Sequence, residues 1–175
     1  MKKLFLILIA AAMLACTAAF AEEGVSADAT VVTASIGDVS FDFTNEQAYF
    51  DVTYRYPDAF ELEIKEDGDR VRHVLRYHVE GCDPSAVGLV ISRTNEYTPE
   101  ERLADFAFID QITTEQINGA PWAIGTKTDT SNGSVIIYAC AAGDYTYTFS
   151  FSSDYPADFD YADFARVFVQ QVALQ

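Results

Sequence analysis

Histidine, cysteine and tryptophan are scarce in this chain of 175 residues, which has two, three and one of them. The two histidines, His73 and His78, fall on one predicted strand at an odd spacing. Side chains alternate along a strand, so the two rings point to opposite faces and cannot share a metal ion or a proton relay. A G-x-S-x-G nucleophile motif and a glycine-rich phosphate-binding motif are also missing from the sequence. These absences argue against an enzyme and indicate no cofactor and no metal-ion site.

Basic side chains are few as well: 11 Lys and Arg stand against 27 Asp and Glu, a net charge of −16. An acidic surface repels nucleic acid and anionic membranes. Half of the residues are hydrophobic and 14% are aromatic, a composition unlike that of an acidic disordered segment. The sequence therefore predicts a folded acidic protein that does not bind nucleic acid, and it leaves open the binding of a cation such as calcium.

Long hydrophobic runs are absent except at residues 4–15, which follow Lys2 and Lys3. This run is shorter than the stretch of about 20 apolar residues that spans a membrane. With Ala19 and Ala21 as the small residues of an A-x-A cleavage site, it predicts a signal peptide over residues 1–21 and a secreted mature chain without a transmembrane segment. The alternative is a lipid on Cys16, which would make the protein a membrane-anchored lipoprotein.

Two cysteines, Cys82 and Cys140, follow the predicted leader. An even number of cysteines in an exported chain favours a disulfide between them. The alternative is a pair of unrelated buried thiols, because free cysteine packs as a small hydrophobe.

Alternation of apolar and polar residues predicts strands over much of the remaining sequence. Residues 22–37 are small and polar, which predicts a flexible lead-in, and residues 38–175 are expected to form one domain. The first two predicted strands, 39–43 and 48–57, are separated by a predicted turn at 44–47.

Three residue pairs are typical of tight hairpin turns: Asp67-Gly68, Asn118-Gly119 and Gly143-Asp144. Folding about the first pair sets Ile64 opposite Val71. The strand after the last pair carries its aromatic side chains on one face, and these are Tyr145, Tyr147, Phe149 and Phe151. This wide apolar face needs a cover.

Two segments have helical patterns. Thr98 is a predicted N-cap, and Glu101 lies three residues later, as in a capping box. Residues 160–172 have apolar side chains at helical spacing, so this second helix is the expected cover of the aromatic face. We therefore predict an α+β fold, an antiparallel sheet with two packed helices.

Five short segments share a pattern with a known family. They are "YRYP" (54–57), "TPEE" (98–101), "INGAPW" (117–122), "YTYTFSF" (145–151) and "FARVFVQQV" (164–172). In these segments and in the order of its elements the chain resembles the PsbP-like/DcrB-like family. The resemblance implies a sheet flanked by helices (an α/β/α sandwich), and bacterial members are often exported proteins or lipoproteins of unknown role. It includes no catalytic signature, so it assigns no functional residue.

Two places are candidates for ligand binding. Arg72, Arg76 and His78 form a basic stripe on the outer face of a predicted strand, which either pairs with neighbouring glutamates or contacts an anion. Trp122, beside Pro121, either packs in the core or lines a ligand cleft.

A packed domain without a catalytic constellation favours an exported, non-enzymatic binding domain, with an unknown protein or envelope component as its partner. The alternatives are a small-ligand or cation-binding (calcium) module, or a lipoprotein anchored through Cys16.

Overall fold

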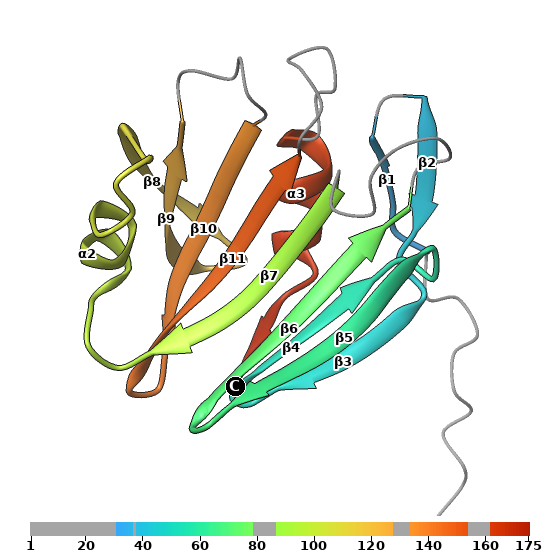
Figure 1. Ribbon diagram of the computed structural model, residues 1–175. Helices are drawn as coiled ribbons and strands as arrows, with labels where there is room; N and C mark the ends of the chain where they lie inside the picture. The colour runs from blue at the N-terminus through green and yellow to red at the C-terminus, as the bar shows by residue number, and fades with distance from the viewer. Residues whose placement is uncertain (1–30, 37, 79–86, 128–133, 154–161) are drawn as a thin grey trace, which may run out of the picture. The chain divides into compact units, whose positions relative to one another are not determined.

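Antiparallel strands make up most of the described part of the protein (Figure 1). The computed structural model describes residues 31–36, 38–78, 87–127, 134–153 and 162–175. Its main sheet has seven strands in the order β5-β6-β7-β11-β10-β9-β8. Their bounds are β5 Phe60–Asp67, β6 Arg70–Tyr77, β7 Val87–Thr94, β8 Gln111–Ile117, β9 Ala120–Thr126, β10 Ser134–Ala142 and β11 Tyr145–Ser153.

Among the described residues there are also two smaller sheets and two helices. Residues 31–175 form one compact unit. One sheet has the order β12-β4-β3, and the other pairs β1 with β2. The bounds are β1 Thr33–Ile36, β2 Val39–Asp42, β3 Asn45–Tyr49, β4 Val52–Tyr56, α2 Pro99–Ala104, α3 Ala162–Gln170 and β12 Ala173–Leu174. Within the described ranges, neither helix is long and apolar enough to cross a lipid bilayer.

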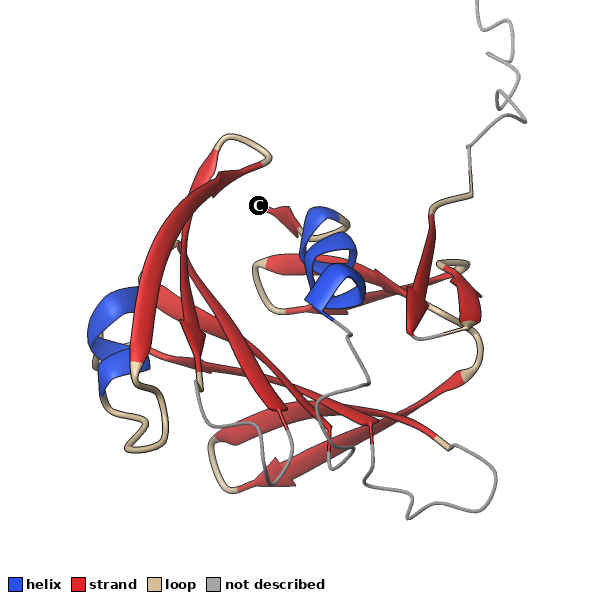
Figure 2. Cartoon of the chain, turned by 90° about the horizontal axis from the view of Figure 1, so that it is seen from above, coloured by secondary structure: helices blue, strands red, loops and turns tan. Residues whose placement is uncertain are grey.

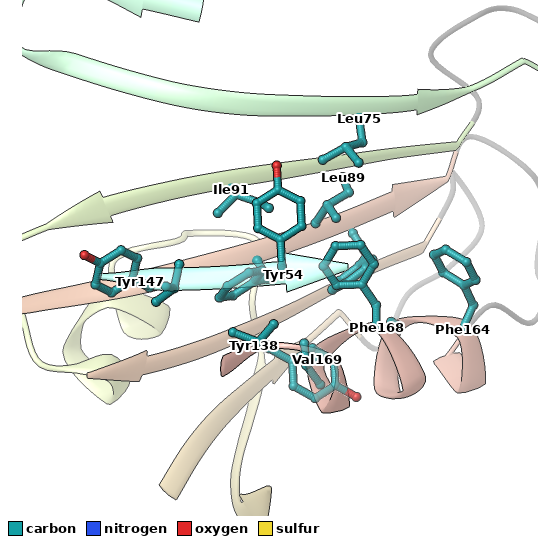
Figure 3. Close-up of a cluster of buried hydrophobic side chains, with 14 of the residues drawn as sticks. Tyr54, Leu75, Leu89, Ile91, Tyr138, Tyr147, Phe164, Phe168 and Val169 are labelled. Atoms are coloured by element: carbon teal, nitrogen blue, oxygen red, sulfur yellow. The ribbon is translucent and has the colours of Figure 1, made fainter. Parts of the chain in front are cut away.

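Aromatic side chains fill the core, which α3 helps to close. The helix contacts β10 of the main sheet and β4 of the three-stranded sheet, and Figure 2 shows it beside both. The ring centroid of Phe168 lies 5.5 Å from that of Phe151 and 5.8 Å from that of Tyr54. Figure 3 shows Phe168 and Tyr54 within the cluster of buried side chains. Phe164 stacks on Phe60, with 5.3 Å between ring centroids. One helix therefore joins side chains from both sheets in a single buried layer.

The predicted α+β class, an antiparallel sheet with two packed helices as in an α/β/α sandwich, is wrong. Strands hold 62% of the described residues and helices only 12%. Thr98 does begin α2 with the predicted capping box, but the helix has six residues and buries only Leu103. Much of the aromatic face is covered by strands, because Tyr49 and Tyr54 come from β3 and β4, which form a sheet of their own.

The first strands also differ from the prediction. Residues 44–47, predicted to be a turn, lie largely within β3, and the chain turns at Phe50 and Asp51 instead. β3 is an edge strand with mostly polar residues, so alternation in the sequence does not reveal it. β1 lies within the predicted lead-in at 22–37, and its Ile36 is fully buried.

The β5–β6 hairpin has a different register from the predicted one. Ile64 lies opposite His73 rather than Val71, because the two central turn residues are Gly68 and Asp69. Gly68 has a φ of 59°. A positive φ at the first central position is what a type II′ turn requires, and glycine there is the usual solution. The shift is two residues, so each side chain keeps its predicted face.

The other two predicted turns are confirmed. Asn118 and Gly119 connect β8 to β9, and Gly143 and Asp144 connect β10 to β11. The signal peptide (1–21), Cys16 and Cys82 lie outside the described residues.

Candidate functional site

A cleft of about 570 Å³ opens beside the β8–β9 turn. One side consists of that turn together with the end of α3 and β12. Another side consists of residues from β3 and β4. The lining includes charged groups (Glu46 and Arg55), amides (Asn118, Gln170 and Gln171), the Thr53 hydroxyl and apolar groups (Ile117, Ala120, Trp122, Val172, Ala173 and Leu174). It therefore offers a ligand both apolar contact and hydrogen-bonding groups.

The β8–β9 turn is fixed to α3 by a side-chain hydrogen bond. Asn118 has a φ of 52° and Gly119 one of 80°, as a type I′ turn requires. In this conformation Asn118 Nδ2 donates to the carbonyl of Gln170 at 2.8 Å. Carbonyls at a helix C-terminus lack partners within the helix, so the asparagine satisfies one of them. The turn and the helix end thus form one rigid wall.

The β4 side of the cleft carries an exposed ion pair. Arg55 Nε lies 3.2 Å from Glu46 Oε2, and their side chains are 45% and 59% exposed. Such surface pairs contribute little to stability, so both groups can reorient toward a ligand at small cost. Nearby, Gln175 Nε2 donates to Thr53 Oγ1 at 3.1 Å, which holds the end of the chain beside β4.

Trp122 lines this cleft, although only 2% of it is exposed. Its ring packs against Phe149, with centroids 5.6 Å apart, and against Tyr138 at 6.4 Å. It is a core residue whose remaining surface faces the cleft. Its role in ligand binding stays a prediction.

The basic stripe on β6 is placed beside carboxylates. Arg76 Nη1 lies 2.6 Å from Glu63 Oε2, and His78 Nε2 lies 3.1 Å from Glu61 Oε2. The hydrogen bond from Arg76 lowers the pKa of Glu63. Arg72 is exposed and lies opposite Lys65 in the strand register. Two members of the stripe therefore have partners on β5, none of the three lines the cleft, and anion binding by the stripe stays a prediction.

His73 is a buried core histidine that is hydrogen-bonded to Tyr54. Its Nδ1 lies 2.8 Å from the Tyr54 hydroxyl, and the residue is 4% exposed. Burial lowers the pKa of His73 and raises the pKa of Tyr54, so both stay neutral near pH 7. Neither group lines the cleft.

Cys140 is a free, buried thiol in β10, and burial raises its pKa to about 12. Its predicted partner Cys82 lies outside the described residues, so the structure does not show the disulfide, which stays a prediction. Across the described ranges, no cluster of three or more His, Cys, Asp and Glu side chains is arranged to hold a metal ion.

Most of the cleft was missed by sequence reasoning. Asn118 was recognised as a turn residue, but its bond to α3 depends on tertiary contact between distant segments. Arg55 and Glu46 belong to the strand pair whose turn was misplaced, so their pairing was not foreseen. The "INGAPW" segment was the one available signal, because it marks both the turn and Trp122.

The arrangement defines an antiparallel β protein in which one amphipathic helix closes the core between sheets. Similar architecture is found in the solution structure of cyanobacterial PsbP (CyanoP) from Synechocystis sp. PCC 6803. The TM-score is 0.56 and the identity 11%, over 81% of this chain and 98% of that one. The chain has a PsbP-like fold, and the resemblance predicted from the sequence is confirmed at that level.

A second similar structure is a crystal structure from Bacteroides thetaiotaomicron VPI-5482. Its TM-score is 0.47 and its identity 10%, over 71% of this chain and 45% of that one. No family model and no curated protein matches the sequence. The comparisons therefore establish a fold and name no activity.

Proposed function

We propose that the protein is an exported binding domain without catalytic activity, and that the cleft beside the β8–β9 turn holds a small polar ligand. The observation that supports this most is the cleft itself. Its volume of about 570 Å³ is within the range of small-molecule sites. Its walls combine amides, a hydroxyl and an ion pair with apolar surface, which suits a ligand that carries several hydrogen-bonding groups.

The placement of the reactive side chains supports a binding role. His73 is buried against Tyr54, and the thiol of Cys140, with a pKa of about 12, is protonated at neutral pH. A thiol acts as a nucleophile in its ionised form, so the protonated Cys140 is a poor nucleophile. A catalytic base must reach the proton that it removes, which the buried His73 could do only for a group in the core. Both groups lie away from the cleft lining.

Thermal unfolding in the presence of sugars, amino acids and dicarboxylates tests the binding site. At least one class is expected to raise the Tm of the wild-type protein, and R55Q should reduce that shift because it removes a charged group from the cleft. R102Q is the matched control, since Arg102 also forms a surface ion pair, with Asp105, but does not line the cleft. Equal shifts in wild type and R55Q would place the ligand elsewhere.

The absence of catalysis has its own test. A broad screen of hydrolase substrates should give no turnover with the purified protein. Turnover that one point substitution abolishes would overturn this part of the proposal.

Export is proposed with cleavage after Ala21. The support comes from the sequence of residues 1–21. The intact mass of the native protein, together with cell fractionation, should show a chain that starts at Glu22. A mass that corresponds to a lipid-modified Cys16, with the protein in the membrane fraction, would establish the lipoprotein alternative.

A further inference from the structure

The β3–β4 turn places a phenylalanine where two other hairpins of this chain use glycine. Gly68-Asp69 and Gly143-Asp144 each begin with a residue of positive φ, 59° and 55°. Phe50-Asp51 occupies the same two turn positions, and Phe50 has a φ of 53°. A bulky side chain in this left-handed region is a genuine outlier, because its Cβ crowds the backbone. Glycine would form this turn with less strain.

Burial in the core does not explain the phenylalanine. The side chain of Phe50 is 45% exposed. It is nevertheless held in place, because Arg93 Cζ lies 3.2 Å from its ring centroid and Tyr49 packs edge-on at 4.9 Å. Arg93 Cζ also lies 4.1 Å from the ring centroid of Tyr145. We call Phe50, Arg93 and Tyr145 the arginine–aromatic platform.

The guanidinium of this platform is available to a partner. Five Lys and Arg side chains form ion pairs, and these are Arg55, Lys65, Arg76, Arg102 and Arg166. In the part of the chain that the structure describes, no Asp or Glu carboxylate lies within 4 Å of the Arg93 guanidinium. The carboxylate of Asp51 accepts a hydrogen bond from the Tyr147 hydroxyl at 3.0 Å instead. Arg93 also approaches this hydroxyl, and because a guanidinium has five N–H donors, its contacts among the described residues leave donors for a further acceptor.

A chain of packed side chains runs from the platform toward a second exposed apolar residue, although the residues between them, Tyr49 and His73, are buried. Tyr49 packs against both Phe50 and His73, and His73 lies opposite Ile64 in the strand register. Ile64 is 51% exposed. Within the platform itself an arginine lies against the exposed ring of Phe50 and the ring of Tyr145, and arginine and tyrosine are residues enriched in protein–protein hot spots.

We propose that the arginine–aromatic platform is a protein-docking surface, and that its partner presents one carboxylate next to an apolar side chain. The carboxylate would accept hydrogen bonds from Arg93, and the apolar side chain would pack on Phe50. The net charge of −16 argues against a polyanionic partner such as nucleic acid, an anionic membrane or a strongly acidic peptide. A single carboxylate suffers less from this repulsion. The surface is separate from the cleft, since none of its three residues lines it.

An NMR titration of ¹⁵N-labelled protein with short synthetic peptides tests this inference. The probes are peptides that end in Phe or Leu with a free C-terminal carboxylate, and the controls are the same peptides with a C-terminal amide. We expect the amide signals of Phe50, Asp51 and Tyr145 and the Arg93 Nε–H signal to shift with the free acids. The amidated peptides should leave them in place.

Two variants separate recognition from a structural role. R93Q and F50G are each expected to raise the Kd of the free-acid peptides by about tenfold, while R70Q, on the opposite face of the sheet, leaves it unchanged. F50G should also keep the Tm close to that of wild type, because relief of the left-handed backbone offsets the lost contacts with Arg93 and Tyr49.

Each contrary result overturns the proposal. Peptide binding that R93Q does not weaken would place the site elsewhere, and no binding by any peptide would leave the platform a structural clamp. Arg93-dependent binding to phosphatidylglycerol vesicles without peptide binding would assign the surface to lipid.

Discussion

Phe168 and Phe50 have the same type of side chain, but Phe168 is buried and Phe50 is exposed. Phe168 is 1% exposed and packs between the main sheet and the three-stranded sheet, in a conformation that α3 favours. Phe50 is 45% exposed, at a turn whose φ of 53° suits glycine. Phe168 stabilises the fold because its ring is buried. Phe50 has an exposed ring, and its positive φ costs conformational free energy. The comparison distinguishes the core around α3, which stabilises the fold, from the β3–β4 turn, which we propose binds a partner protein.

The largest effect is expected from F168A. Removing a fully buried aromatic ring loses its transfer free energy and leaves a cavity, so the free energy of unfolding should fall by about 3–5 kcal/mol. F108A is the matched control, because Phe108 is 46% exposed and should change stability little. Chemical denaturation of both variants makes the measurement. Equal losses would show that the core is not centred on α3.

A smaller loss is expected from G125A. A Cβ at Gly125 would lie 3.1 Å from Ile109 Cγ2 and 3.3 Å from Leu103 Cδ2. Since α2 is anchored mainly by Leu103, the added methyl group should push the helix outward and cost about 1–3 kcal/mol. G88A is a control at a roomier position, where the nearest atom is 3.7 Å away. Denaturation midpoints of the two variants should differ, and an unchanged G125A would show that α2 packs loosely.

A pH-dependent effect is expected from His73, whose pKa burial lowers in the folded state. The unfolded chain then binds more protons than the folded one as the pH falls below about 6.5. The contribution of neutral His73 to the free energy of unfolding is therefore fully present above about pH 6.5. It is lost as the pH falls toward the pKa that His73 has in the folded protein. The difference in Tm between pH 7 and pH 5.5 should be smaller in H73F than in wild type. An equal difference in both proteins would assign the acid sensitivity to other groups.

Local chemistry explains which parts of the fold could be predicted. The β10–β11 hairpin was read correctly because Gly143 marks its turn and its aromatic residues alternate with Thr and Ser. The capping box of α2 was also readable, since Thr98 and Glu101 are three residues apart. These features depend on neighbours in the sequence.

Features that depend on distant segments could not be read in the same way. Covering the aromatic face required the three-stranded sheet as well as a helix, and its β3 strand is too polar to reveal itself. The turn at Phe50 was missed because glycine, the usual signal, is absent there. In the cleft, Asn118 and Gln170 meet only after the chain has folded.

A very small effect is expected from E63Q. In the wild-type protein the Glu63 carboxylate pairs with Arg76 and Lys65 on an exposed face, and exposed ion pairs contribute little to stability. The Tm of this variant should match that of wild type at physiological salt. A clear loss would mean that the β5–β6 hairpin is coupled to the core more tightly than its exposure indicates.

The free energy of unfolding of F50G tests most directly the claim that Phe168 stabilises the core and Phe50 does not. Losing the contact with Arg93 removes about 0.5–1 kcal/mol at an exposed site, and losing the ring contact with Tyr49 removes about 0.5–1.5 kcal/mol more. Relieving the left-handed backbone returns about 1–2 kcal/mol. These terms nearly cancel, so we predict that F50G is about as stable as wild type. A loss comparable to that of F168A would contradict the account, because it would make Phe50 a residue of the core.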